Sequence, residues 1–91
     1  MNDLETLHDT FLRRNFVILD TETTGLGFGS EIIEIAIVSM AGVAVVNTRI
    51  CPVNGIPASA TAIHGITERD VHAAPTWPLV RSQVARARHV R

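Results

Sequence analysis

Residues 16–26 read FVILDTETTGL, and this stretch of the 91-residue chain decides its fold. Its first four residues, Phe16 to Leu19, are apolar and favour a strand that is buried on both faces. Polar residues follow from Asp20 onward, and residues 25–30 then form a glycine-rich segment that is typical of an open turn. The stretch therefore predicts a central strand that stops at Asp20, beside a turn, with two carboxylates at its carboxyl end.

The two carboxylates are Asp20 and Glu22. Residues spaced i and i+2 in a strand point to the same face about 6.5–7 Å apart, so both carboxylates converge on one small volume. Like charges at that distance repel unless one group is protonated or a cation binds. Mg²⁺ and Mn²⁺ prefer carboxylate oxygens, and pairs of these ions catalyse phosphodiester hydrolysis. The spacing alone leaves open the alternative that both residues are solvated members of a turn.

An apolar run, residues 32–40, predicts a second strand, and residues 43–51 predict a third. Ala41-Gly42 is expected to join them as a two-residue antiparallel turn, because glycine tolerates positive φ. Alternation along the second strand places Ile33, Ile35 and Ile37 on one face and Ile32, Glu34, Ala36 and Val38 on the other. A buried Glu34 would need a partner, so it either faces the carboxylate pair or binds an arginine.

Short helices are expected after the strands. Residues 58–63 predict one helical turn, and Thr67 to Asp70 has the pattern of a capping box, with Asp in place of Glu. Pro78 suits the first position of a helix that runs to about Val90 with a modest apolar stripe. Residues 1–15 predict an arm or a short amphipathic helix. The fold class is therefore α/β, with a three-stranded antiparallel sheet followed by a helix.

Composition limits the classes of protein to which the chain can belong. A chain of 91 residues forms at most one small domain. Its content of 46% hydrophobic and 19% charged residues is typical of a folding chain and not of a disordered one. No apolar run approaches the roughly 18 residues of a membrane span, and the acidic N-terminus does not resemble a secretion signal. With a single cysteine, Cys51, we expect a cytoplasmic protein without membrane contact.

Charge is divided between the two ends of the chain. Residues 1–34 contain seven acidic residues and two arginines, whereas residues 71–91 contain four arginines and no acidic residue. All eight basic residues are arginine. This preference suits phosphate recognition, but coding bias explains it as well.

Four segments together resemble the 3′ to 5′ exonucleases of the DEDD superfamily, in the DNA polymerase III epsilon-like proofreading branch. These segments are FVILDTETTGL at 16–26, EIIEIAIV at 31–38, AIHGIT at 62–67 and APTW at 74–77. The resemblance implies an RNase H-like fold, two divalent metal ions (Mg²⁺ or Mn²⁺) and hydrolysis of the 3′-terminal nucleotide in DNA replication or repair. It implies as partners the 3′ end of single-stranded DNA or RNA and, as a candidate, a DNA polymerase subunit.

The resemblance also assigns roles to individual residues. Asp20 matches the carboxylate that ligates both metals, and Glu22 matches the second ligand of the same motif. The positions that line the pocket for the terminal nucleotide are matched by Thr23, Thr24, Leu26, Ile63 and His64.

The chain also departs from the family pattern. The family needs two more aspartates and a general base, and no acidic residue follows Asp70. We therefore expect residues 16–91 to be the N-terminal part of an exonuclease domain, with an incomplete RNase H-like fold and an incomplete, inactive metal site. The first strand is then expected to be an exposed edge that promotes self-association. The alternative is a non-catalytic module that binds nucleic acid or protein through the same half-sheet.

Overall fold

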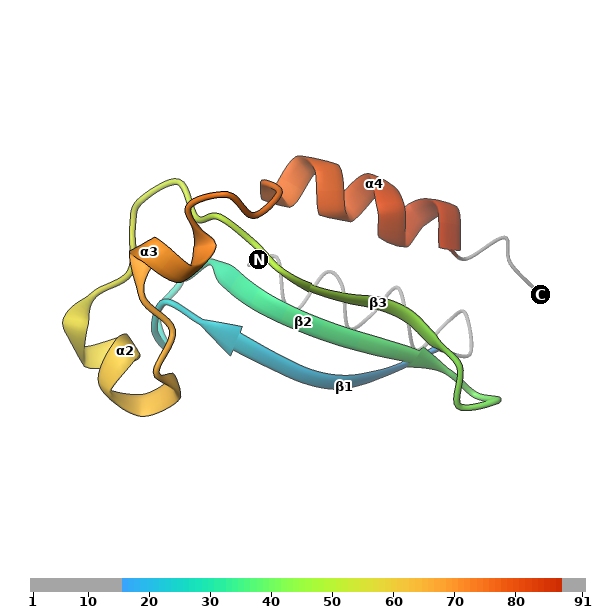
Figure 1. The fold of residues 1–91 in the computed structure, drawn as a ribbon. Coiled ribbons are helices and arrows are strands. Elements are labelled where there is room, and N and C mark those ends of the chain that lie inside the picture. The colour runs from blue at the N-terminus through green and yellow to red at the C-terminus, as the bar shows by residue number, and fades with distance from the viewer. Residues whose placement is uncertain (1–15, 88–91) are drawn as a thin grey trace.

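The structure is a computed structural model that describes residues 16–87, with side chains from Asp20 to Arg86. It contains a three-stranded sheet, two short helices at one end of the sheet and a longer helix over one face (Figure 1). The elements are β1 Phe16–Thr23, β2 Ile32–Ser39, β3 Ala44–Arg49, α2 Ala58–His64, α3 Glu68–Val71 and α4 Trp77–Ala87. The predicted N-terminal arm and the predicted end of the last helix near Val90 lie outside the described residues.

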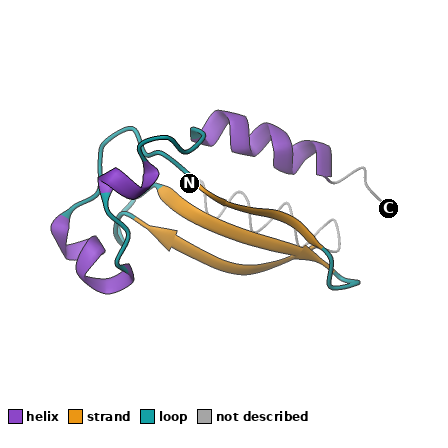
Figure 2. Ribbon diagram, in the orientation of Figure 1, coloured by secondary structure: helices purple, strands orange, loops and turns teal. Residues whose placement is uncertain are grey.

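The three strands lie in the order β1-β2-β3, and both neighbouring pairs are antiparallel. This confirms the predicted antiparallel sheet followed by helices (Figure 2). Within the described part of the chain, β2 and not β1 is the central strand, because β1 pairs with β2 alone. The self-association expected from an exposed β1 edge stays a prediction.

The strand β1 is longer than the apolar run that predicted it. We expected it to stop at Asp20, whereas pairing with β2 continues through Asp20, Thr21, Glu22 and Thr23. Backbone hydrogen bonding to a neighbouring strand does not depend on side-chain polarity, so polar residues extend a strand wherever a partner strand is in register. Both carboxylates are therefore strand residues.

Two irregularities in the pairing of β1 with β2 decide which side chains face the core. One shift lies between the pairs Ile18↔Ile37 and Asp20↔Ala36, where β1 has one extra residue. The other lies between Glu22↔Glu34 and Thr23↔Ile32, where β2 has one extra residue, Ile33. An extra residue in one strand reverses the faces of the residues beyond it. The Asp20 side chain therefore lies on the same face of the sheet as Ala36, its partner in β2.

The second shift makes our prediction of the two faces of β2 partly wrong. Ile35 and Ile37 share a buried cluster with Ile32, which we had placed on the opposite face. Ile33 instead joins a separate buried cluster with Ile66 and Val71. The simple alternation fails because it assumes an unbroken ladder.

The helix α4 covers one face of the sheet. Val80 and Val84, two residues of its predicted apolar stripe, are buried in the same cluster as Ile35 and Ile37. Its first residue is Trp77, so Pro78 occupies the second helical position and not the first as predicted. Since burial of apolar side chains is the main favourable term in folding, this cluster carries most of the stability of the sheet.

The turn between β2 and β3 is one residue longer than predicted. Ser39 O accepts from Gly42 N at 2.9 Å, and Val43 O accepts from Ser39 N at 2.9 Å. Gly42 has a φ of 82°, the left-handed conformation that closes a three-residue hairpin loop. The role predicted for glycine is confirmed at this position.

The capping box predicted at Thr67 to Asp70 is confirmed at the start of α3. Asp70 N donates to the Thr67 hydroxyl at 3.3 Å, and Thr67 N donates back to Asp70 Oδ2 at 2.9 Å. The Thr67 hydroxyl also lies 3.0 Å from Asp70 Oδ2. The backbone hydrogen bond from Thr67, followed by its side-chain hydrogen bond, lowers the pKa of the Asp70 carboxyl from its ordinary value of 3.8.

This pKa shift predicts part of the acid sensitivity of the fold. The pKa of Asp70 is lower in the folded state than in the unfolded state, so its ionised carboxylate stabilises the fold in full at pH values above the unfolded-state pKa. This stabilisation is lost as the pH falls through the folded-state pKa. Replacing Asp70 with Asn is expected to flatten the acid limb of a plot of melting temperature against pH, measured between about pH 6 and pH 2. Thr67→Ala, which keeps the backbone donor, is expected to have an intermediate effect. Parallel acid limbs for Asp70→Asn and wild type would contradict this assignment.

Candidate functional site

Asp20 and Glu22 lie on the same face of the sheet. Asp20 pairs with Ala36 and Glu22 pairs with Glu34, and both partners alternate with the buried Ile35 and Ile37. The α4 helix packs on the isoleucine face, so the two carboxylates lie on the opposite one. Asp20 is exposed and Glu22 is half-buried. The sheet therefore positions both groups rigidly while leaving Asp20 accessible to solvent.

The donor chemistry of this pair fits a hard divalent cation. Carboxylate oxygens on neighbouring positions of one strand face are the ligands that Mg²⁺ and Mn²⁺ prefer. Among the side chains described from Asp20 to Arg86, none donates a hydrogen bond to either carboxylate. Within the same range, no third His, Cys, Asp or Glu completes a group of three metal-binding side chains. The described residues therefore place two carboxylates, Asp20 and Glu22, together without a third metal-binding side chain beside them.

Two threonines shape the loop between β1 and β2. The Thr23 hydroxyl donates to Gly25 O at 2.7 Å, and the Thr24 hydroxyl accepts from Glu31 N at 3.0 Å. A backbone bond from Thr24 N to Glu31 O, 2.9 Å long, closes the base of the loop. Thr23 and Thr24, two of the predicted pocket residues, therefore form hydrogen bonds within the loop itself.

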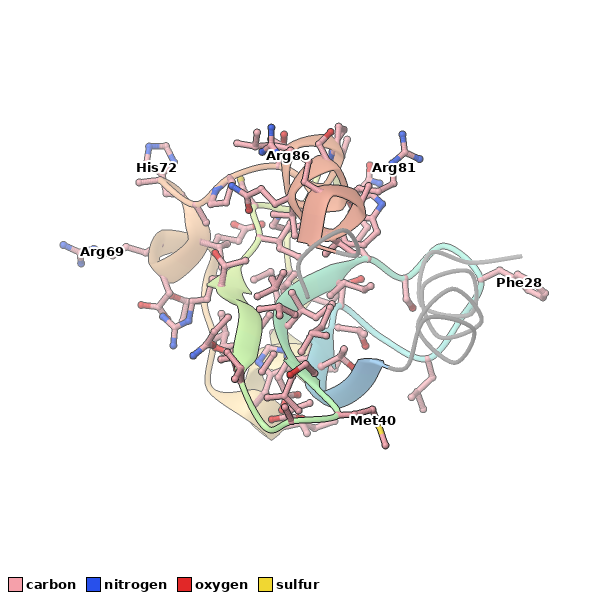
Figure 3. All side chains as sticks on the ribbon, turned by 90° about the vertical axis from the view of Figure 1, so that its right-hand side faces the viewer. Phe28, Met40, Arg69, His72, Arg81 and Arg86 are labelled. Carbon is pink, nitrogen blue, oxygen red and sulfur yellow. The ribbon has the colours of Figure 1, made fainter. Side chains whose placement is uncertain are left out.

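The closed loop presents apolar side chains to solvent. Leu26, a predicted pocket residue, and Phe28 are both exposed on it, and Phe28 projects away from the body of the molecule (Figure 3). Positive φ is found at Gly42, Gly55 and Gly65 and at none of the loop glycines 25, 27 and 29. The loop is therefore held by the threonine hydrogen bonds and does not require left-handed glycines.

His64 joins the end of α2 to the end of β1. Its Nε2 lies 3.2 Å from Thr23 O, and its Nδ1 accepts from Ile66 N at 3.0 Å. Since a backbone N–H only donates, Nδ1 is the acceptor and Nε2 carries the proton that it donates to Thr23 O. The contact brings two predicted pocket residues, Thr23 and His64, together, although they are 41 positions apart in the chain.

Ile63, the residue before His64, is exposed on α2. Gly65 ends this helix with a φ of 78°, and its N–H donates to Thr61 O at 2.7 Å. The left-handed cap reverses the chain directly after His64. The predicted pocket residue Ile63 is therefore open to solvent, whereas His64, the next predicted pocket residue, anchors the end of α2.

Glu31 is a structural residue of the site that the sequence reasoning missed. Its two carboxylate oxygens accept from Val53 N at 2.7 Å and Asn54 N at 3.0 Å. Two successive backbone donors in the segment after β3 are thereby bound to the start of β2. No local pattern in the sequence identifies this contact, because Glu31 and Val53 are 22 positions apart in the chain.

Two surface hollows lie away from the carboxylates. One of about 240 Å³ is bordered by Cys51, Gly55 and residues of α3, and one of about 200 Å³ lies between Glu31, Val53 and Trp77. Neither hollow is lined by Asp20 or Glu22. No helix in the described part of the chain combines the length and hydropathy needed to cross a bilayer.

A family model described as an exonuclease matches residues 17–88 of this chain. The chain is also 48% identical over 75 residues to an uncharacterized exonuclease of Escherichia phage 186. That match covers 82% of this chain and 39% of the phage protein. No solved structure matches the chain significantly.

Two further relatives are similar over comparable lengths. A DNA polymerase III subunit epsilon-like protein of Rhodobacter capsulatus is 49% identical over 67 residues, which are 66% of this chain and 10% of the relative. An uncharacterized protein of Salmonella typhimurium is 42% identical over 62 residues, which are 68% of this chain and 45% of the relative. The chain thus spans less than half the length of each of these three relatives.

Proposed function

The chain belongs to the exonuclease family whose model it matches over residues 17–88, and from this membership we propose that it carries two ligands of a metal-dependent 3′ to 5′ exonuclease. The observation that carries the proposal is the placement of Asp20 and Glu22 on one sheet face, opposite α4. The three strands and the helices that follow them form part of an RNase H-like exonuclease fold.

In the proposed reaction, Asp20 would hold both divalent ions and Glu22 would hold one. When bound, Mg²⁺ or Mn²⁺ supplies an activated water and neutralises charge on the leaving oxygen. The two carboxylates would hold the ions in fixed positions, because their strand is paired with β2 through Thr23. The phosphodiester bond of the last nucleotide is then hydrolysed, which releases a nucleoside monophosphate.

Around the carboxylates, we propose that Thr23, Thr24, Leu26, Ile63 and His64 form the pocket for the terminal nucleotide. The exposure of Leu26 and Ile63 supports this assignment, because apolar side chains open to solvent can contact the face of a base. The hydrogen bond from His64 to Thr23 O supports it as well, since it holds α2 beside the end of β1.

The remaining metal ligands must come from residues other than Asp20 and Glu22. The family resemblance calls for two more aspartates and a general base, and residues 71–91 contain neither Asp nor Glu. We therefore expect the 91-residue polypeptide alone to be inactive. A role in replication or repair beside a DNA polymerase, in the cytoplasm, belongs to the same proposal, and its support is the epsilon-like relative.

The experiment that tests this function follows the products of single-stranded DNA and RNA labelled at the 5′ end. The protein is purified as the 91-residue chain and, separately, with any coding sequence that continues it. With Mn²⁺, the longer form is expected to produce a ladder shortened from the 3′ end, and a chelator or a 3′-terminal phosphorothioate is expected to suppress it. Release of the 5′ label as a mononucleotide, without a ladder of shortened labelled strands, contradicts the polarity. Robust trimming by the 91-residue chain contradicts its inactivity and indicates ligands from a second copy.

The exposed arginines of the helices favour one alternative function, a binding module without catalysis. Arg69 on α3 and Arg81 and Arg86 on α4 point into solvent (Figure 3), and arginine binds phosphate well. Such binding weakens steeply with salt because it releases counterions. Salt-dependent DNA binding that is unaffected by Asp20→Asn and by a chelator, without any trimming, supports this alternative over the nuclease.

A further inference from the structure

Three charged residues form a row across the sheet on the carboxylate face. Glu22 of β1 pairs with Glu34 of β2, and Glu34 pairs with Arg49 of β3. Directly opposed side chains in an antiparallel pair lie close enough to interact. The row therefore places Glu34 between a proposed metal ligand and an arginine.

Within this row, the arginine is bound to the middle residue. Arg49 Nε donates to Glu34 Oε2 at 3.1 Å. The side chains are 46% and 36% exposed, respectively, so the pair lies at the surface and can rearrange. Both roles considered for Glu34 from the sequence are observed, because it lies opposite Glu22 on the carboxylate face and also binds Arg49.

Without Glu34, the same arginine would have another acceptor within reach. Glu22 lies two strand spacings from Arg49, about 9.5 Å, and extended Arg and Glu side chains together span that gap. A guanidinium bound to Glu22 would occupy oxygens that a cation needs and would place a positive charge beside the ion. Asp70 is a competing acceptor, because the charge of Arg49 already contributes to lowering its pKa.

We propose that Glu34 is a positioning residue, which holds Arg49 on the β3 side of the sheet and so leaves the Glu22 carboxylate available to a divalent cation. This inference rests on the proposed function, because it assumes that Glu22 is a ligand. It assigns Glu34 no direct contact with the ion. The like-charge pair Glu22 and Glu34 is tolerated in this arrangement, since Arg49 neutralises one member of it.

A double-mutant cycle on Mn²⁺ affinity, measured by electron paramagnetic resonance on the 91-residue chain, tests the proposal. Glu34→Gln is expected to weaken Mn²⁺ binding about two- to fivefold, the competition expected from an exposed ion pair. Adding Arg49→Met is expected to restore the affinity, whereas Arg49→Met alone changes it little. This non-additivity separates positioning from a general charge effect, in which Arg49→Met would tighten binding equally in both backgrounds.

Three outcomes of this cycle overturn the proposal. An unchanged affinity in Glu34→Gln means that Arg49 turns elsewhere, for example to Asp70. A double variant as weak as Glu34→Gln means that Glu34 is itself a ligand. Equal effects of Arg49→Met with and without Glu34 mean that only net charge matters.

A metal-free measurement separates failure of this inference from failure of the proposed function. The NMR resonance of the Arg49 Nε–H group is expected to shift in Glu34→Gln and to shift again when Glu22→Gln is added. Glu22→Gln alone is expected to leave it almost unchanged. If the second shift is absent, the arginine does not move to Glu22 and the inference is wrong. If wild type binds Mn²⁺ no better than Asp20→Asn, the proposed function fails, while the NMR result still decides where Arg49 goes.

Discussion

Replacing Asp20 with Asn is expected to reduce metal-dependent trimming by at least about 100-fold in the form of the protein that is active. Loss of a group that merely supports a metal ligand already costs about 10- to 100-fold, and Asp20 is proposed to bind both ions directly. Asn keeps the size of the side chain but removes its charge, so it cannot offset the charge of two divalent ions. Glu22→Gln, which affects one proposed ion, is expected to have a smaller effect.

The rate of trimming at saturating Mn²⁺, together with the melting temperature, measures this effect. Asp20 is exposed, so the substitution should leave the melting temperature nearly unchanged. Asp70→Asn is the matched control, because it removes one carboxylate that lies outside the sheet face and should keep near wild-type activity. Wild-type trimming rates in Asp20→Asn would show that the carboxylate pair is not the catalytic centre.

The largest loss of stability is expected from truncating Ile35. Its side chain has no exposed surface and packs in the cluster that joins the sheet to α4. Replacing a buried isoleucine with alanine lowers the free energy of unfolding by about 2–5 kcal/mol, through lost transfer energy and the cavity left behind. A domain of this length has a total free energy of unfolding of about 5–14 kcal/mol. Ile35→Ala therefore removes a large part of the stability.

The chain offers a matched control for this substitution in Ile63. That side chain is 86% exposed on α2, so Ile63→Ala should change the free energy of unfolding by less than about 0.5 kcal/mol. Urea denaturation followed by circular dichroism measures both variants. Similar denaturation midpoints for Ile35→Ala and Ile63→Ala would contradict the assignment of the core. If the proposed pocket is correct, Ile63→Ala weakens substrate binding without affecting stability.

Features that depend on a few neighbouring residues could be predicted from the sequence. The capping box of α3 closes between Thr67 and Asp70, and Gly42 closes the turn between β2 and β3. The antiparallel order of the strands followed from the short connection between β2 and β3. These features were predictable because their hydrogen bonds join residues at most four positions apart.

The extent of the strands and the faces of their side chains could not be predicted in the same way. The extra residues in β1 and β2 reverse the side-chain alternation, and Ile32 and Ile33 consequently lie in different clusters from those expected. At the bulge in β2, Ile32 packs in the cluster with Val80 and Val84 of α4, whereas Ile33 packs with Val71 of α3. Neither partner is visible in the alternation of a single strand.

The sequence by itself therefore determined the local elements, the family resemblance and the spacing of Asp20 and Glu22 along one strand. Only the tertiary structure decided that this pair lies opposite α4, that Glu31 binds the segment after β3 and that Arg49 binds Glu34. The physical reason is separation along the chain: Glu31 and Val53 are 22 positions apart, and Glu34 and Arg49 are 15 positions apart. Such contacts form only after the sheet register is established, and that register depends on how the isoleucines of β2 pack against the helices.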